Sequence, residues 1–420
     1  MTSISQDFAP PFKLIAPFFI LGSFFYLISA LFVFFFGVEN LSYLDPKILA
    51  FVHLFLLGFI MMTIFGAMAQ LVPVVLEVGH FGVELFYAIW PILLVGTLLM
   101  VFGFLFSAAL LPYGGVIVLI AMMIFVMEIF MTIFKVEKLT LVMSSVLISN
   151  TFLFFGIIVG LLMALSYAGT ISLDISSMLN AHVYLVIGGY ITITIMGLSV
   201  VLVPMFTLSH GFSMKPLEIS MSLMSVGVIL VVLASFFELI FVKYLGYGLS
   251  IISLFFYFKL IYIIYSTRPR KENDVYAISL MFSYISMLVA ILIAIVYFIT
   301  DKEQFLLAAG WLLFYGFFAF LITGHIYKII PFLVWFEKFS PLVGKQKVPM
   351  LADMVPYKSS QAQFIFSAIG VVLVTIAILF SSNSLLGAGA SFLPPIKPKT
   401  LGASLTKCQE SSSISICTST

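Results

Sequence analysis

The sequence predicts an all-α polytopic membrane protein, and three observations support this fold class. Of its 420 residues, 63% are hydrophobic, 9% are charged and 47 are phenylalanine. A water-soluble domain of this length could not bury so much apolar surface. The hydrophobic residues are gathered into long uninterrupted runs, and a glycine–proline pattern recurs among these runs at regular spacing.

Eleven apolar runs are long enough to cross the hydrocarbon core of a bilayer as helices, which takes about 20 residues. They cover about residues 12–37, 48–75, 82–107, 112–135, 140–167, 178–206, 217–242, 245–266, 275–299, 305–336 and 361–381. The first run is longer than the apolar stretch of a signal peptide, so we interpret it as a retained helix. We therefore expect a single transmembrane helical domain, residues 1–381, in a lipid bilayer.

The segment 382–420 has a different composition. The stretch "SSNSLLGAGASFL", residues 381–393, resembles the start of a twelfth membrane helix, and the chain continues as polar sequence of low complexity that cannot form a core. Two interpretations stay open: a disordered tail, or an altered chain end that replaces a twelfth helix. Both cysteines, Cys408 and Cys417, lie in this tail. Thiolate metal sites and disulfides are therefore excluded from the helical domain.

Loop charges predict the orientation of the helices. If the N-terminus is cytoplasmic, the outer loops hold three lysines, Lys47, Lys243 and Lys302. The inner loops then hold ten basic residues: Lys135, Lys138, Lys215, Arg268, Arg270, Lys271, Lys338, Lys345, Lys347 and Lys358. Because basic residues favour the cytoplasmic side, a cytoplasmic N-terminus is expected. The net charge of +2 gives no indication of nucleic acid binding.

An internal repeat organises the helices. "GFIMMTIFGAMAQLVP", residues 58–73, and "GYITITIMGLSVVLVP", residues 189–204, share Gly, Thr, Gly and Leu-Val-Pro in register. The same glycine–glycine–proline spacing returns at Gly316, Gly324 and Pro331. These copies fall in the second, sixth and tenth helices. The sequence therefore predicts three four-helix pseudo-repeats, at about residues 12–135, 140–266 and 275–381.

The repeated glycines have two interpretations. Glycines eight residues apart lie near one helical face and allow the close approach of a neighbouring helix or of a flat cofactor. Close helix packing alone would explain them. The second interpretation makes four glycines candidate cofactor-binding residues: Gly58, Gly66, Gly189 and Gly197. Each repeat proline removes a helical hydrogen bond, and Gln70, beside Pro73, is expected to cap the freed carbonyls.

All five histidines belong to a repeat helix or to the turn that leaves one. His53 and His182 begin the second and sixth helices, 20 and 22 residues before the repeat prolines, so they are expected at the same depth. His80 and His210 follow these prolines, and His325 precedes the third one by six residues. Imidazole is a common haem and metal ligand, so this shared placement favours a metal site over isolated hydrogen bonds.

Depth decides which histidines could share one iron. Relative to the repeat prolines, His325 lies 14 residues deeper than His53, or about 21 Å along a helix. We therefore expect His53 and His182 to form an outer pair that binds haem. His80, His210 and His325 are candidates for a second, inner metal cluster, although two of them could be solvated loop residues. Glu128 is a carboxyl within the fourth helix, so it is a candidate proton carrier or a protonated acid bonded to a neighbouring helix.

The motif His53-x4-Gly58-Phe59-x6-Gly66-x6-Pro73 resembles the second-helix motif of NnrS-type membrane proteins. "HVYLVIGGY", which runs on to "SHGF", is similar to the later histidine helix of that family. The motif resemblance covers about sixty residues. It implies haem, with copper as a second candidate, and a link to nitric oxide metabolism in a bacterial inner membrane. The predicted repeat arrangement also resembles subunit I of the haem-copper oxidases.

The chain departs from the oxidase pattern, because its seventh helix has no histidine and its tenth has one. Oxidases of that group carry adjacent histidines in the seventh helix and two in the tenth. A full binuclear centre is therefore not expected, and we infer no enzymatic activity from the sequence. Two alternatives stay open: a proton-coupled small-solute permease or channel, and an assembly partner of respiratory-chain proteins.

Overall fold

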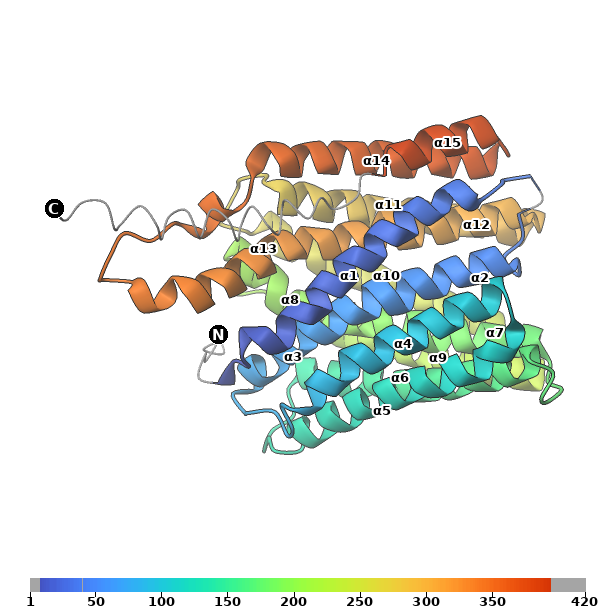
Figure 1. Ribbon diagram of the computed structural model, residues 1–420, viewed down its shortest axis with the longest axis horizontal. Helices are drawn as coiled ribbons and strands as arrows, with labels where there is room; N and C mark the ends of the chain where they lie inside the picture. Colours follow the sequence, from blue (N-terminus) through green and yellow to red (C-terminus); the bar gives the residue numbers. More distant parts are fainter. Residues whose placement is uncertain (1–7, 40, 394–420) are drawn as a thin grey trace. The chain divides into compact units, whose positions relative to one another are not determined.

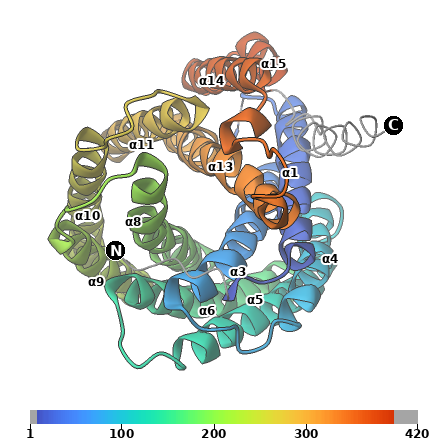
Figure 2. The ribbon, with the colours of Figure 1, turned by 90° about the vertical axis from the view of Figure 1, so that its left-hand side faces the viewer.

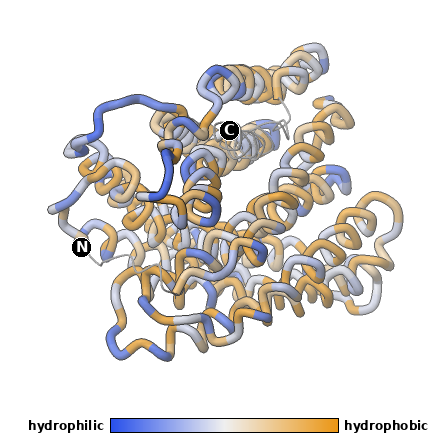
Figure 3. Tube along the Cα trace, turned by 60° about the vertical axis from the view of Figure 1, so that its left-hand side comes forward, coloured by the Kyte–Doolittle hydropathy of each residue, from blue (hydrophilic) through white to orange (hydrophobic). Residues whose placement is uncertain are grey.

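The computed structural model describes residues 8–39 and 41–393, and every regular element in these ranges is a helix (Figure 1). Eleven helices of the described chain are long and apolar enough to cross a membrane. They are Phe12–Phe35, Pro46–Leu76, Leu85–Leu105, Ala108–Ile133, Leu141–Tyr167, Ile175–Thr207, Lys215–Phe237, Ile240–Ser266, Val275–Thr300, Glu303–Lys338 and Tyr357–Leu379. The predicted multi-pass helical architecture is confirmed. The polar colours of Figure 3 gather at loops and helix ends, as expected for such spans.

The described chain divides into two compact units, and two of the three boundaries fall inside helices α1 (Phe12–Phe32) and α3 (Met62–Leu76). Unit 1 comprises the described residues of Met1–Ile15 and Phe65–Lys271. Unit 2 comprises the described residues of Ala16–Ile64 and Glu272–Thr420. None of the three predicted repeat blocks therefore forms a compact unit of its own.

Unit 1 is built from consecutive helices that pack as neighbours. Its main helices are α4 (Leu85–Leu105), α5 (Leu111–Ile133), α6 (Leu141–Tyr167), α7 (Ile175–Val183), α8 (Ile193–Thr207), α9 (Lys215–Phe237) and α10 (Ile240–Ser266). Helices α9 and α10 lie side by side (Figure 2). A Cβ atom on Gly227 would lie 2.9 Å from the Gly246 carbonyl oxygen, so these two backbones touch where only glycine fits.

Unit 2 contains the remaining helices. Besides part of α1, they are α2 (Pro46–His53), α11 (Val275–Thr300), α12 (Glu303–Trp311), α13 (Ala319–Lys338), α14 (Tyr357–Leu379) and α15 (Asn383–Ser391). Helix α15 packs against α14, and a Cβ atom on Gly389 would lie 2.9 Å from the Val374 nitrogen. The start of the predicted tail is therefore a packed helix of nine residues. Residues 394–420, with both cysteines, lie outside the described residues.

All three repeat helices share a construction that the sequence analysis did not predict. Each is interrupted by a π-helical segment: η3 (Leu54–Met61) between α2 and α3, η5 (Tyr184–Thr192) between α7 and α8, and η6 (Leu312–Phe318) between α12 and α13. The first glycine of each repeat, Gly58, Gly189 or Gly316, lies inside its π segment. Such segments are rare in proteins as a whole, and those that occur often lie at functional sites.

The first two repeat helices also end in the same way. Four residues after the repeat proline, Glu77 (φ 55°) and Leu208 (φ 61°) adopt the left-handed conformation that commonly ends helices. The next amide then donates a hydrogen bond of 3.2 Å back to the carbonyl of the proline, Pro73 or Pro204. The third helix differs, because α13 continues seven residues beyond Pro331 to Lys338.

Within unit 2, stacked aromatic rings connect the first and third repeat helices. The Trp311 and Tyr315 rings are 4.3 Å apart and nearly parallel, at 9°. Phe51 and Phe55 stack on Tyr315 at 5.9 and 4.9 Å. The Tyr315 hydroxyl lies 2.7 Å from the Ser29 hydroxyl, which satisfies its polar atom in this apolar setting.

The helix that carries His182 begins at a capping aspartate outside the membrane span. The carboxylate of Asp174 accepts hydrogen bonds from the Ser176 amide (3.0 Å) and the Ser177 amide (3.3 Å). The side chain of Ser177 is the main cause, and these amides a further cause, of a lowered pKa of the Asp174 carboxyl. The cap is therefore complete above the ordinary aspartate pKa and is lost as pH falls through the lowered one.

We expect Asp174→Ala to increase amide hydrogen exchange at Ser176 and Ser177 by about fivefold, because their acceptor is removed. Asp174→Asn is the matched control: it keeps a capping oxygen but should remove the acid dependence of the exchange rates. Exchange measured by mass spectrometry across the acidic range checks both. Equal exchange in Asp174→Ala and the wild type would contradict the capping role.

Candidate functional site

Three of the histidines singled out in the sequence hold a backbone carbonyl through the same ring atom. The Nδ1–H groups of His53 and His325 donate to the carbonyls four residues earlier, Leu49 and Leu321, each at 2.7 Å. His182 Nδ1–H donates to the Gly156 carbonyl at 2.8 Å. Because a carbonyl can only accept, Nδ1 must carry the proton in all three.

This bond pattern fixes the tautomer of each ring. With the proton on Nδ1, the Nε2 atom of a neutral imidazole carries the lone pair. Histidines that ligate metals usually donate their other N–H to a carbonyl or carboxylate in this way. The same bond is also common for histidines that have no ligand. The tautomer therefore permits iron or copper ligation through Nε2.

Of the three rings, that of His182 is held by a neighbouring helix. Its ring lies against α6, where a Cβ atom on Gly160 would stand 2.7 Å from the ring Cε1 atom. One turn earlier on α6 is Gly156, the residue whose carbonyl accepts the Nδ1–H bond. Sequence analysis missed both glycines. Their Gly-x3-Gly spacing, in "GIIVG", was the available signal for a close helix contact.

Side chains from neighbouring helices fill the space beside the repeated glycines. A Cβ atom on Gly58 would lie 2.5 Å from the Phe25 ring, and one on Gly189 would lie 2.6 Å from Phe152. A Cβ atom on Gly197 would lie 1.8 Å from the Ser145 hydroxyl oxygen. These contacts are those of close helix packing, the first interpretation of the repeated glycines, and their role in cofactor binding stays a prediction.

Two candidates from separate parts of the sequence meet in unit 1. His80 Nδ1 lies 2.8 Å from Glu128 Oε1, and both side chains are buried. The other ring nitrogen, Nε2, donates to the Ala69 carbonyl at 2.7 Å. Ala69 is four residues before Pro73, so its carbonyl is the one that the repeat proline leaves without a helical donor. The sequence predicted Gln70 for this capping role, and His80 fills it instead.

The same carboxylate oxygen collects further donors. Thr132 donates its hydroxyl to Glu128 Oε1 at 2.8 Å, and the Phe81 amide donates to both Thr132 Oγ1 (2.9 Å) and Oε1 (3.1 Å). Lys135 Nζ donates to the His80 carbonyl at 3.0 Å. Glu128 Oε2 is buried without a hydrogen bond to the described residues. The pair must hold at least one proton between Nδ1 and Oε1, because two acceptors would otherwise face each other.

The other two histidines of the expected inner cluster have different settings. His210 is exposed, and its Nδ1 lies 3.2 Å from the Leu208 carbonyl. His325 is buried, with the Tyr276 ring edge-on at 5.2 Å. Among the described residues, no group of three or more His, Cys, Asp or Glu side chains could hold a metal ion. The inner cluster stays a prediction.

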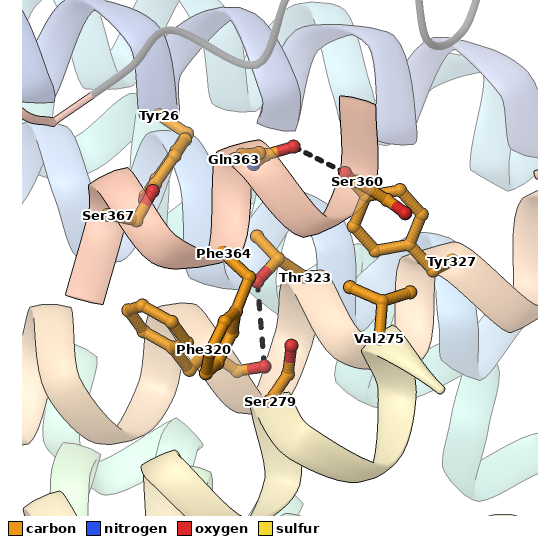
Figure 4. A pocket seen from close by; sticks show the side chains of 10 residues that line it. All are labelled: Tyr26, Val275, Ser279, Phe320, Thr323, Tyr327, Ser360, Gln363, Phe364 and Ser367. Carbon is orange, nitrogen blue, oxygen red and sulfur yellow. Dashed lines mark hydrogen bonds between the residues drawn. The ribbon is translucent and has the colours of Figure 1, made fainter. Parts of the chain in front are cut away.

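A small polar cavity lies in unit 2, and its wall holds no histidine (Figure 4). Its wall holds Tyr26, Val275, Ser279, Phe320, Thr323, Tyr327, Ser360, Gln363, Phe364 and Ser367. The Tyr327 hydroxyl donates to the Gln363 side chain across α13 and α14. The cavity has about 10 Å³ for the centre of a water-sized sphere, which is room for a single water. It cannot hold a haem.

The chain was also compared with known proteins. No protein-family model matches it, and no curated protein matches it either.

Proposed function

We propose that this protein binds haem in the membrane through His53 and His182 and takes part in respiratory or nitric oxide redox metabolism. The observation that carries the proposal is the Nδ1–H bond of each ring to a backbone carbonyl, at 2.7 and 2.8 Å. This bond leaves the lone pair on Nε2, the atom through which such a histidine ligates iron. Copper is the second candidate metal.

The surroundings of the two rings support the same assignment. Both histidines follow the first turns of long apolar spans, and each lies next to the π segment of its helix. His182 Nε2 has no hydrogen-bond partner among the described residues, whereas both nitrogens of His80 have partners. His182 is therefore better suited to ligation than His80. A haem would supply an iron centre for one-electron transfer there.

The finer architecture is part of this proposal. The shared α–π–α construction and the glycine–proline spacing of three helices support three four-helix pseudo-repeats similar to those of haem-copper oxidase subunit I. The excess of basic residues in alternate loops supports a cytoplasmic N-terminus in a bacterial inner membrane. Respiratory-chain proteins are the proposed partners.

The visible absorption spectrum of the purified full-length protein tests the haem proposal. We expect a Soret band and, after reduction by dithionite, sharpened α and β bands. His53→Ala and His182→Ala should each reduce these features strongly, because each removes one of the two residues that would hold the haem. His210→Ala is the matched control, since that ring is exposed and should leave the spectrum unchanged. A folded, colourless wild-type protein, or a fully coloured double variant, would refute the proposal.

One observation favours a second candidate function, a proton-coupled permease. Buried ionisable residues in membrane helices commonly mark proton pathways, and the His80–Glu128 pair is such a group. A colourless protein whose solute uptake into vesicles requires a proton gradient, and is lost in Glu128→Gln, would support this candidate over haem binding.

A further inference from the structure

His182 is held differently from the other two anchored histidines. His53 and His325 use carbonyls of their own helices, one turn earlier, so their tautomer needs no neighbouring helix. His182 reaches across to α6 and bonds the carbonyl of Gly156. The orientation of this ring therefore depends on what α6 presents to it.

Gly160 exposes the acceptor. In an α-helix the residue at i+4 lies on the same face as residue i, so a side chain at 160 would cover the carbonyl of Gly156. A Cβ atom at this position would stand 2.7 Å from the His182 Cε1 atom and 3.1 Å from Nδ1. That is closer than such atoms pack, so the ring would have to move away from its carbonyl partner.

Gly156 brings the two helices together. A Cβ atom on Gly156 would lie 2.8 Å from Val186 Cγ2 and 3.2 Å from Leu185 Cβ, both in the π segment η5. Glycine at 156 thus lets η5 approach α6 closely enough for the imidazole to reach the carbonyl. The two glycines have separate tasks: one sets the distance between the helices, and the other leaves room for the ring.

We propose that Gly156 and Gly160 are positioning residues that hold the His182 ring with its proton on Nδ1 and its lone pair on Nε2. Their effect on haem rests on the proposed function, whereas their effect on the tautomer does not. Outer partners of ligating histidines tune metal affinity by about 10–100-fold, so Gly160→Ala should weaken haem binding by that factor.

Nitrogen NMR of histidine-labelled, full-length protein without haem, in nanodiscs, tests the positioning role. Comparison with His182→Gln identifies the His182 signals. We expect the Nδ1–H tautomer in the wild type and its loss in Gly160→Ala. Gly248→Ala on α10 is the matched control, because a Cβ atom there meets nothing within 4 Å. Haem titration of the wild type, Gly160→Ala and Gly248→Ala gives the second measurement.

The outcomes separate the two proposals. An Nδ1–H tautomer that persists in Gly160→Ala overturns the positioning role, as does an Nε2–H tautomer in the wild type, which can be measured even if the variant does not fold. A tautomer change in Gly160→Ala with no haem binding in the wild type supports the positioning role and refutes the haem proposal. A tautomer change together with about 10–100-fold weaker haem binding supports both.

Discussion

Replacing His80 by alanine is expected to lower the free energy of unfolding by about 2–5 kcal/mol, because it leaves the buried Glu128 carboxyl without its hydrogen-bonded partner. The substitution takes away the group 2.8 Å from Glu128 Oε1 and leaves the Ala69 carbonyl without a donor. It also opens a cavity, because His80 is only 7% exposed. Unfolding in detergent with increasing denaturant measures the change.

His210→Ala is the control for this prediction, and we expect a change within about 0.5 kcal/mol, because the ring is exposed. A double-mutant cycle of His80→Ala with Glu128→Ala should give a coupling energy of about 0.5–3 kcal/mol. If His80→Ala were as stable as His210→Ala, the buried pair would not stabilise the fold.

Gly189→Ala is expected to lower the free energy of unfolding by about 1–3 kcal/mol, because the added methyl overpacks a tight helix contact. Its Cβ atom would lie 2.6 Å from Cβ and from Cγ of Phe152, and the Cβ atom is fixed to the α6 backbone and cannot rotate away. The same denaturant titration measures the loss. Gly248→Ala should show no such loss, since that position is open.

A compensating substitution makes the packing prediction specific. Combining Gly189→Ala with Phe152→Gly removes the side-chain atoms of residue 152 that the new methyl would meet, so the double variant should be more stable than the sum of the two single effects predicts. Simple additivity would show that Phe152 is not the side chain that restricts position 189.

The membrane spans could be predicted because hydropathy depends on composition over about 20 residues and not on detailed packing. Each of the eleven predicted runs overlaps one of the eleven spans of the structure. The π segments could not be predicted. In an amphipathic helix, a π segment would appear as a local change in the period of the hydrophobic residues. The segment "LFLLGFIM" is apolar on every side, so the sequence shows no such change.

The site was predicted in part, for a related reason. Position relative to the prolines singled out His80, and burial in the membrane singled out Glu128, but their contact joins residues 48 positions apart. Nothing local in the sequence indicates which helix faces the turn after Pro73. The same limit applies to Gly156, whose carbonyl is an acceptor in any sequence and gains its role only from the helix that packs beside it.

The π segments affect which neighbours the two parts of a composite helix face. A wide turn accommodates one more residue than an α turn, so it shifts the angular phase of the part before it relative to the part after it by about 100°. In the first two repeat helices, the part that holds the histidine and the part that holds the proline can therefore face different neighbours although the chain runs on without a break. Deleting a single residue such as Leu57 would restore a regular helix and rotate His53 by about 100° relative to Pro73. A gap of one residue would damage this protein more than many substitutions.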